Sequence, residues 1–153
     1  MGKFLAKIAV VFSLALCGCV AVGEYLYFDG IDKFKWVPVY VAETEGVEIP
    51  PEFKSEFGQI YISFAASPDG YEVRGMSGCN IFNGGMELKG GREVEFTKML
   101  TTRRAGKYAG FERKFLGALS KTHFVVRDGN FLYFCNKKGG REMTVLKFRK
   151  EEG

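Results

Sequence analysis

The sequence predicts a mainly β domain of the α+β class, in which one helix packs against an antiparallel sheet that curls or closes on itself. Short apolar runs separated by glycine-containing turns, a pattern typical of hairpins, fill most of the chain. A single stretch near residues 108–119 instead repeats its apolar residues with the period of a helix. At 153 residues, 46% hydrophobic and 26% charged, the chain fits one folded domain.

The first 18 residues are expected to be a lipoprotein signal peptide and not part of the fold. Lys3 and Lys7 give a positive start, and the apolar run Ile8–Leu16 is shorter than the about 20 residues that a membrane-spanning helix needs. An uncleaved membrane segment and a signal without a lipid are the alternatives.

The stretch Leu16-Cys17-Gly18-Cys19 resembles a bacterial lipobox, in which a small residue precedes the cysteine that is acylated. Cys19 is the better candidate, because acylation of Cys17 would place the bulky Leu16 at the cleavage position. Several acyl chains on Cys19, such as palmitate, would exceed the two signals that stable membrane anchoring requires. The sequence therefore predicts a protein held on a membrane surface.

The charge balance of the mature chain argues against a nucleic-acid partner. Removal of Lys3 and Lys7 reduces the 22 basic residues to 20, against 18 acidic ones. Basic residues do gather near the predicted helix, and a solvated face is favoured there over contact with anionic lipids. They are Arg103, Arg104, Lys107, Arg113 and Lys114.

The predicted organisation is a signal peptide at 1–18, a lipid anchor and lead-in segment at 19–35, and the domain at 36–150. The apolar run Tyr25-Leu26-Tyr27-Phe28 indicates that part of the lead-in packs. Trp36–Val41 is expected to be the first strand, with Pro38 at an edge or a bulge. Ala42–Glu56 is rich in acidic residues and proline and is interpreted as an acidic surface loop.

The next elements are expected to be hairpins. Ile60, Ile62 and Phe64 alternate with polar residues as in a half-buried strand, and the turn 67–70 leads into its partner 71–75. A second hairpin is predicted at 86–96. After the helix, a third follows at 124–134, turning at Arg127-Asp128-Gly129-Asn130, and 143–148 forms the last strand.

The stretch Gly75-Met76-Ser77-Gly78-Cys79-Asn80-Ile81-Phe82-Asn83-Gly84-Gly85 brings a hydroxyl, a thiol and two amides together among four glycines. A structural corner is favoured, because Gly78 and Gly84 permit angles or close approaches that a Cβ forbids, and Asn80 bonds well to nearby backbone. Cys79 is then a small buried side chain. A nucleophile elbow would need glycine at position 79.

These motifs together resemble the META domain of the HslJ-type heat-shock lipoproteins. The resemblance covers about Trp36 to Lys150, and its motif residues are Gly75, Ser77, Gly78, Cys79, Asn80, Phe82 and Gly84, followed by Phe96-Thr97-Lys98-Met99, Glu112-x-x-Phe115-Leu116-x-x-Leu119 and Leu146-Lys147-Phe148. It implies a small barrel-like antiparallel sheet with one packed helix, a place in the cell envelope, and links to heat-shock response. It implies no enzymatic activity.

Two alternatives are open for Cys79 and Cys135, the only other cysteines of the mature chain if Cys19 is acylated. A disulfide between them would contribute about 4 kcal/mol in the chain-entropy model. Free thiols are favoured, because Cys135 lies in a strand and Thr101 stands where the resemblance places a partner for Cys79. Two cysteines make no zinc site, and the sequence indicates no cofactor.

The resulting prediction is a monomeric, non-catalytic lipoprotein of the bacterial cell envelope that acts as an interaction or stress-response module. Val20 and Ala21, where an Asp would follow the anchor of an inner-membrane protein, favour the periplasmic face of the outer membrane in a two-membrane organism. An envelope enzyme inhibitor or small-ligand-binding barrel is the alternative. A thiol enzyme is the least favoured, because His123 is the only histidine available as a base.

Overall fold

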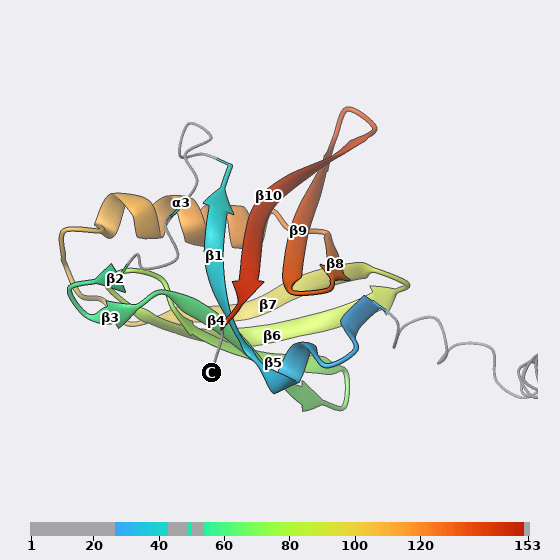
Figure 1. The fold of residues 1–153 in the computed structure, drawn as a ribbon, viewed down its shortest axis with the longest axis horizontal. Helices are drawn as coiled ribbons and strands as arrows, with labels where there is room; N and C mark the ends of the chain where they lie inside the picture. The colour runs from blue at the N-terminus through green and yellow to red at the C-terminus, as the bar shows by residue number, and fades with distance from the viewer. Residues whose placement is uncertain (1–26, 43–48, 50–53, 152–153) are drawn as a thin grey trace, which may run out of the picture.

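A computed structural model describes residues 27–42, 49 and 54–151. Eight strands form one antiparallel sheet that closes in the order β1-β10-β9-β8-β7-β6-β5-β4 (Figure 1). The prediction of a mainly β, antiparallel fold with one helix is confirmed. The strands are β1 (Lys35–Val41), β4 (Tyr61–Ser67), β5 (Gly70–Met76), β6 (Ile81–Gly90), β7 (Glu93–Thr101), β8 (Phe124–Asp128), β9 (Phe131–Lys138) and β10 (Arg141–Lys150).

Four further elements accompany the ring in the described part of the chain. The 3-10 helix η2 (Ile31–Lys33) precedes β1, and β2 (Lys54–Ser55) pairs with β3 (Gly58–Gln59) as a separate two-stranded sheet. The helix α3 (Ala109–Ser120) connects β7 to β8. Its buried face is Phe115, Ala118 and Leu119, on the side that the apolar spacing predicts.

The first strand contains the irregularity that its proline suggested. The pairing of β1 with β10 shifts register between Pro38 and Tyr40, and Pro38 has no N–H to donate to the ladder. The loop that follows differs from the acidic surface loop expected at Ala42–Glu56. Ile49 is buried and its N–H donates to the Val39 carbonyl (2.9 Å), while residues 43–48 and 50–53 lie outside the described residues.

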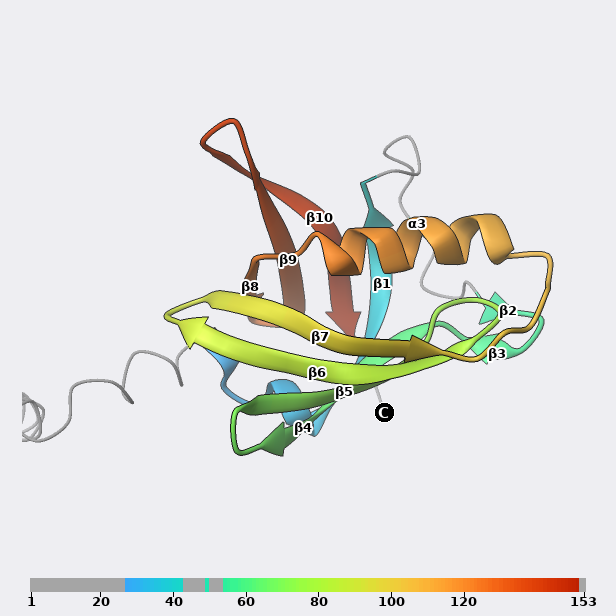
Figure 2. The same cartoon turned by 180° about the vertical axis from the view of Figure 1, so that it is seen from behind.

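The ring is joined most weakly between β7 and β8. Their pairing consists of Glu93 opposite Phe124, with the Val94 N–H donating to the His123 carbonyl (2.8 Å) and the Val125 N–H to the Arg92 carbonyl (3.0 Å). Helix α3 runs alongside this part of the ring (Figure 2). Its Phe115 side chain enters the core, where its ring centroid lies 5.9 Å from that of Phe82 and 6.0 Å from that of Phe148.

Aromatic side chains fill the interior of the ring. Phe134 lies at its centre, with ring centroids 4.9 Å from Phe148, 5.5 Å from Phe96 and 6.4 Å from Phe64. The lead-in segment contributes too, since Phe28 and Ile31 are fully buried in the same core. The packed body therefore begins before residue 36. Burying apolar area of this kind is the main favourable term in folding.

The β9–β10 hairpin extends beyond the ring as an arm (Figure 1). Its outer residues 137–143 are exposed, and an ion pair between Arg92 and Glu142 connects this outer part to the β6–β7 turn. Among the described helices none has the length and apolar character to cross a bilayer.

Candidate functional site

The glycine-rich stretch 75–85 forms the corner between β5 and β6. Gly75 is the second-last residue of β5 and is buried, and a Cβ there would lie 2.5 Å from the Phe82 ring and 2.2 Å from the Tyr61 carbonyl oxygen. Gly78 adopts φ +139°, a conformation that side chains with a Cβ rarely take. Gly84 packs against β7, where a Cβ would lie 2.4 Å from the Met99 sulfur.

The turn 77–80 encloses the carboxylate of Glu112, which comes from the first turn of α3. Oε2 accepts hydrogen bonds from the Ser77 hydroxyl (2.6 Å), the Cys79 N–H (3.0 Å) and the Asn80 N–H (2.8 Å). Oε1 accepts one from the Asn80 amide nitrogen (2.7 Å). Four donors from one turn thus converge on one side chain 32 to 35 residues away in sequence.

Asn80 extends this network to the segment that follows β7. Its Oδ1 accepts from the Thr102 hydroxyl (2.9 Å) and the Arg104 N–H (2.6 Å), and its Nδ2 also donates to the Arg104 carbonyl (3.0 Å). Since Asn80 is only 4% exposed, these bonds satisfy polar atoms that would otherwise be costly to bury. The network therefore joins three segments: the corner, the chain after β7, and α3.

The hydrogen bonds set the ionisation of Glu112. Burial by itself would raise the pKa of this carboxyl, but the hydrogen bonds from Ser77, Asn80 and the Cys79 backbone outweigh it and hold the pKa below its ordinary 4.5. Glu112 is therefore a carboxylate at neutral pH. Its oxygens already accept four internal hydrogen bonds, so it is poorly placed to act as a general base on a substrate.

Cys79 and His123 do not come together. Cys79 is fully buried beside Gly106, where an added Cβ would lie 2.8 Å from the sulfur. His123 is exposed and follows the other end of α3. The helix between Glu112 and Ser120 rises by about 12 Å, so no hydrogen bond between thiol and imidazole is within reach.

The disulfide alternative is contradicted in the structure, where Cys79 and Cys135 are both free and buried. Cys79 lies at the N-terminal end of α3, whereas the Cys135 carbonyl accepts from the His123 N–H (2.9 Å) beyond its C-terminal end. A disulfide requires Cα atoms within about 7 Å. Burial also raises the pKa of the Cys135 thiol, which keeps it protonated.

A native alkylation experiment can test whether Cys79 has a chemical role. We expect Cys79 to react with iodoacetamide at least about tenfold more slowly in the folded protein than in urea, because a buried thiol is inert until the chain opens. Mass spectrometry after timed quenching measures the labelled fraction at Cys79 and Cys135. Rapid native labelling of Cys79 would contradict the assignment of this corner to structure alone.

Sequence reasoning did not single out Glu112 as a site residue. A glutamate on a helix is usually solvated, and no local spacing links it to residues 77–80. The available signal was its place in the same family resemblance as the glycine-rich stretch. Cys19 lies outside the described residues, and within residues that are described no three His, Cys, Asp or Glu side chains gather as metal ligands would.

Comparisons with known proteins agree with this architecture. The family model for the META domain matches residues 31–151. The chain is also similar to a solved structure described as the NMR structure of the protein from Burkholderia xenovorans, with a TM-score of 0.56 and 22% sequence identity over 80% of this chain and 85% of that one. At this identity the likeness shows the fold alone. No curated protein matches the chain.

Proposed function

The chain belongs to the META domain family, and from this premise we propose that it is a non-catalytic interaction module, anchored by lipid to a membrane of the bacterial envelope and acting in the stress response. The observation that carries the proposal is the saturated Glu112 carboxylate. The polar groups of the family motif bond one another and so serve to fix α3 on the ring.

The filled interior favours an interaction module over a small-ligand-binding barrel. A ligand site is normally a cavity of about 300 Å³ or more that buries most of its ligand. In the described core, Phe64, Phe115, Phe134 and Phe148 occupy the space where such a ligand would lie. The outer surface and the projecting β9–β10 arm are then the parts available to a partner.

Metabolic labelling tests the anchor. Cells supplied with radioactive palmitate are expected to label the wild-type chain, and the Cys19→Ala variant is expected to lose the label and leave the membrane fraction. The physical reason is that acyl chains on one cysteine supply nearly all of the membrane affinity. Cys17→Ala is the matched control and should keep the label. An unlabelled wild-type chain would contradict the proposed anchoring.

Affinity capture from detergent-solubilised envelopes distinguishes the two binding hypotheses. A structural or stress-related envelope protein recovered by the wild-type chain supports the proposed module. A hydrolase recovered stoichiometrically and inactive in the complex would favour an envelope enzyme inhibitor instead.

A further inference from the structure

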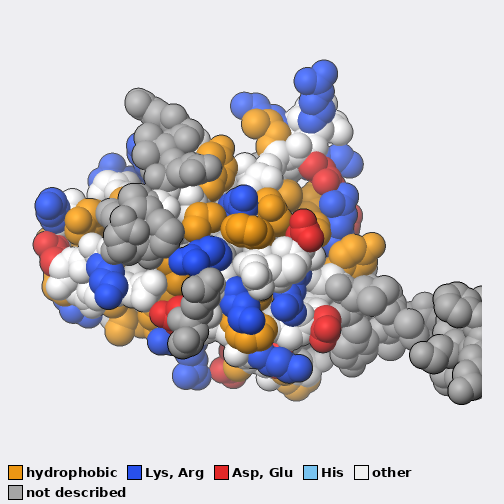
Figure 3. All heavy atoms as spheres, in the orientation of Figure 1, with side chains coloured by type: hydrophobic (Ala, Val, Ile, Leu, Met, Phe, Trp, Pro, Cys, Tyr) orange, Lys and Arg blue, Asp and Glu red, His pale blue; other side chains and the backbone are white. Residues whose placement is uncertain are grey.

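Basic and aromatic side chains gather on the surface at the end of the ring where β1 and β9 begin and β10 ends. We call this surface the docking face; it consists of Phe34, Lys35, Tyr61, Phe131, Tyr133, Lys147 and Lys150. Figure 3 shows lysine and arginine side chains gathered over β1 and β10, with hydrophobic side chains between them. All seven residues are half-buried or exposed.

The lysines of this face lie over aromatic rings. Lys147 Nζ lies 4.3 Å from the ring centroid of Phe131 and 5.3 Å from that of Tyr133. Lys150 Nζ lies 4.0 Å from the Phe34 centroid. Lys35 Nζ lies 4.9 Å from the Tyr61 centroid. A ring holds an ammonium in place without neutralising it.

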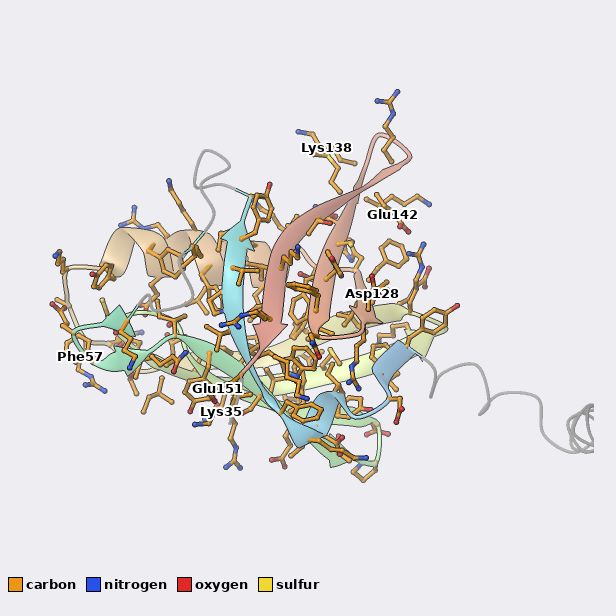
Figure 4. The ribbon with its side chains drawn as sticks, viewed as in Figure 1. Lys35, Phe57, Asp128, Lys138, Glu142 and Glu151 are labelled. Atoms are coloured by element: carbon orange, nitrogen blue, oxygen red, sulfur yellow. The ribbon has the colours of Figure 1, made fainter. Side chains whose placement is uncertain are left out.

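The positive charge of the face is therefore not cancelled by ion pairs. Within the described part of the chain, the salt bridges involve Arg74, Lys89 and Arg92 and none of the three lysines of the face. Two acidic residues, Asp128 and Glu151, lie at its margin, and Figure 4 places Glu151 beside Lys35. Arg127, whose guanidinium lies 5.6 Å from the Phe34 centroid, adds a further positive charge.

We propose that the docking face lies on the anionic headgroups of the membrane to which the chain is anchored. The inference rests on the proposed function, since it takes Cys19 as the anchor. It deepens that proposal by assigning the orientation of the domain. The end of the ring where β1 begins and β10 ends is directed toward the lipid, and the β9–β10 arm, at the other end of these strands, is directed away from it (Figure 1).

The position of the face relative to the anchor supports a lipid surface as its occupant. Phe34 and Lys35 stand at the start of the ring, immediately after the lead-in segment, and seven residues separate Cys19 from Tyr27, the first described residue. An extended chain of that length reaches at most about 28 Å. A tether this short keeps the face at an effective concentration in the millimolar range near the headgroups. Weak contacts are then enough to hold the face on the membrane.

The chemistry of the face also fits headgroups. Tyrosine and phenylalanine rings with lysine between them are the side chains that settle at a membrane–water interface, where apolar parts meet the acyl boundary and charges meet phosphates. Attraction of this kind falls as salt screens it. A protein partner would more often be met by a surface depleted of lysine.

Lysine footprinting on vesicles tests the proposal. The lipidated chain, purified from membranes, is reconstituted into vesicles of phosphatidylcholine alone and of phosphatidylcholine with phosphatidylglycerol, and amines are acetylated and quantified by mass spectrometry. We expect acetylation of Lys35, Lys147 and Lys150 to be several-fold slower on the anionic vesicles, with high salt removing the difference. Lys137 and Lys138, at the outer end of β9, are the internal control and should label equally; Figure 4 marks Lys138 on the arm.

A variant pair sharpens the result. The double variant Lys147→Gln with Lys150→Gln should reduce the protection of Lys35 on anionic vesicles. Each charge removed should lower the equilibrium constant for docking by roughly fivefold. Lys137→Gln with Lys138→Gln should leave it unchanged. Both pairs alter exposed or half-buried polar ends, and an unchanged melting temperature verifies that the ring is intact.

The outcomes separate this inference from the proposed function. If the chain floats with both vesicle types but its lysines are acetylated equally on both, the anchor is supported and the docking face is contradicted. If the chain floats with neither vesicle type, both the anchor and the docking face are contradicted. Protection of the same lysines by a soluble anionic polysaccharide such as alginate, with none from anionic vesicles, would overturn the lipid surface in favour of a glycan.

Discussion

Replacing Glu112 by alanine is expected to lower the free energy of unfolding by about 3 kcal/mol. The substitution removes the acceptor shared by the Ser77 hydroxyl, the Cys79 N–H, the Asn80 N–H and the Asn80 amide. The Ser77 hydroxyl keeps the Asn80 carbonyl and the Asn80 amide keeps the Arg104 carbonyl, but the two backbone N–H groups are left without a partner. Each unsatisfied buried donor costs about 1–3 kcal/mol. Water entering the corner would offset part of the sum. Urea unfolding followed by circular dichroism measures the change.

The matched control is Glu72→Ala, which removes a glutamate from an exposed ion pair with Arg74. We expect a change of less than about 1 kcal/mol there, as is usual for surface pairs. Equal effects of the two substitutions would show that the corner does not depend on the carboxylate.

The contribution of Glu112 should also depend on pH. Its pKa in the folded protein lies below 4.5, so the stabilisation is present above the ordinary pKa and is lost as pH falls through the folded value. The difference in unfolding free energy between wild type and Glu112→Gln should therefore be largest near neutrality and shrink below pH 4.5. Urea titrations at several pH values check this, and a constant difference would contradict it.

The second large effect is expected at Gly75. In Gly75→Ala the new methyl carbon would lie 2.2 Å from the Tyr61 carbonyl oxygen and 2.5 Å from the Phe82 ring. The backbone oxygen cannot move without disturbing the β4–β5 pairing, in which Ile62 lies opposite Gly75. We expect the free energy of unfolding to fall by at least about 3 kcal/mol, more than the usual cost of overpacking. Urea unfolding measures the change.

Gly117→Ala provides a comparison with the same chemical change. Gly117 lies inside α3, and a Cβ there would have no neighbour within 4 Å. Alanine in a helix interior is favoured over glycine by about 0.5–1 kcal/mol, so this variant should be more stable than wild type. Opposite signs for the two substitutions are the expected result, and a tolerated Gly75→Ala would contradict the packing of the corner.

The hairpins could be predicted from the sequence because their information is local. The hairpin turns place glycine where the backbone needs it, as at Gly129 with φ +57° between β8 and β9. A strand such as β4 alternates in burial, with Ile62 and Phe64 buried between partly exposed neighbours. The helix was predictable for the same reason. Its buried Phe115 and Leu119 are four residues apart.

The partner of the glycine-rich corner could not be predicted in the same way. The bond from the Ser77 hydroxyl to Glu112 spans 35 residues, and nothing in the neighbourhood of Glu112 marks it as other than a solvated helix residue. The bulge in β7 was missed as well. Asn83 pairs with Leu100 and Gly85 with Thr97, so β7 has one more residue than β6 between these pairs. Lys98 is the extra residue and has φ +51°, an unusual conformation for a lysine.

The boundaries of the domain were harder to predict from the sequence than its strands and helix. Tyr25-Leu26-Tyr27-Phe28 indicated packing in the lead-in, but only the fold shows that Phe28 and Ile31 reach the core. The same holds for Ile49. It is buried beside Val39, and the proline-rich, acidic sequence around it does not predict this contact.

The single Glu93–Phe124 pairing between β7 and β8 has a consequence for local opening of the folded protein. Local unfolding begins where few interactions must break, so this seam is where the ring would part first, with amide protons of β8 exchanging before those of β5 and β6. Because α3 connects β7 to β8 across this seam, we expect the Glu112 carboxylate, which fixes the start of α3, to slow the opening from the other end of the helix.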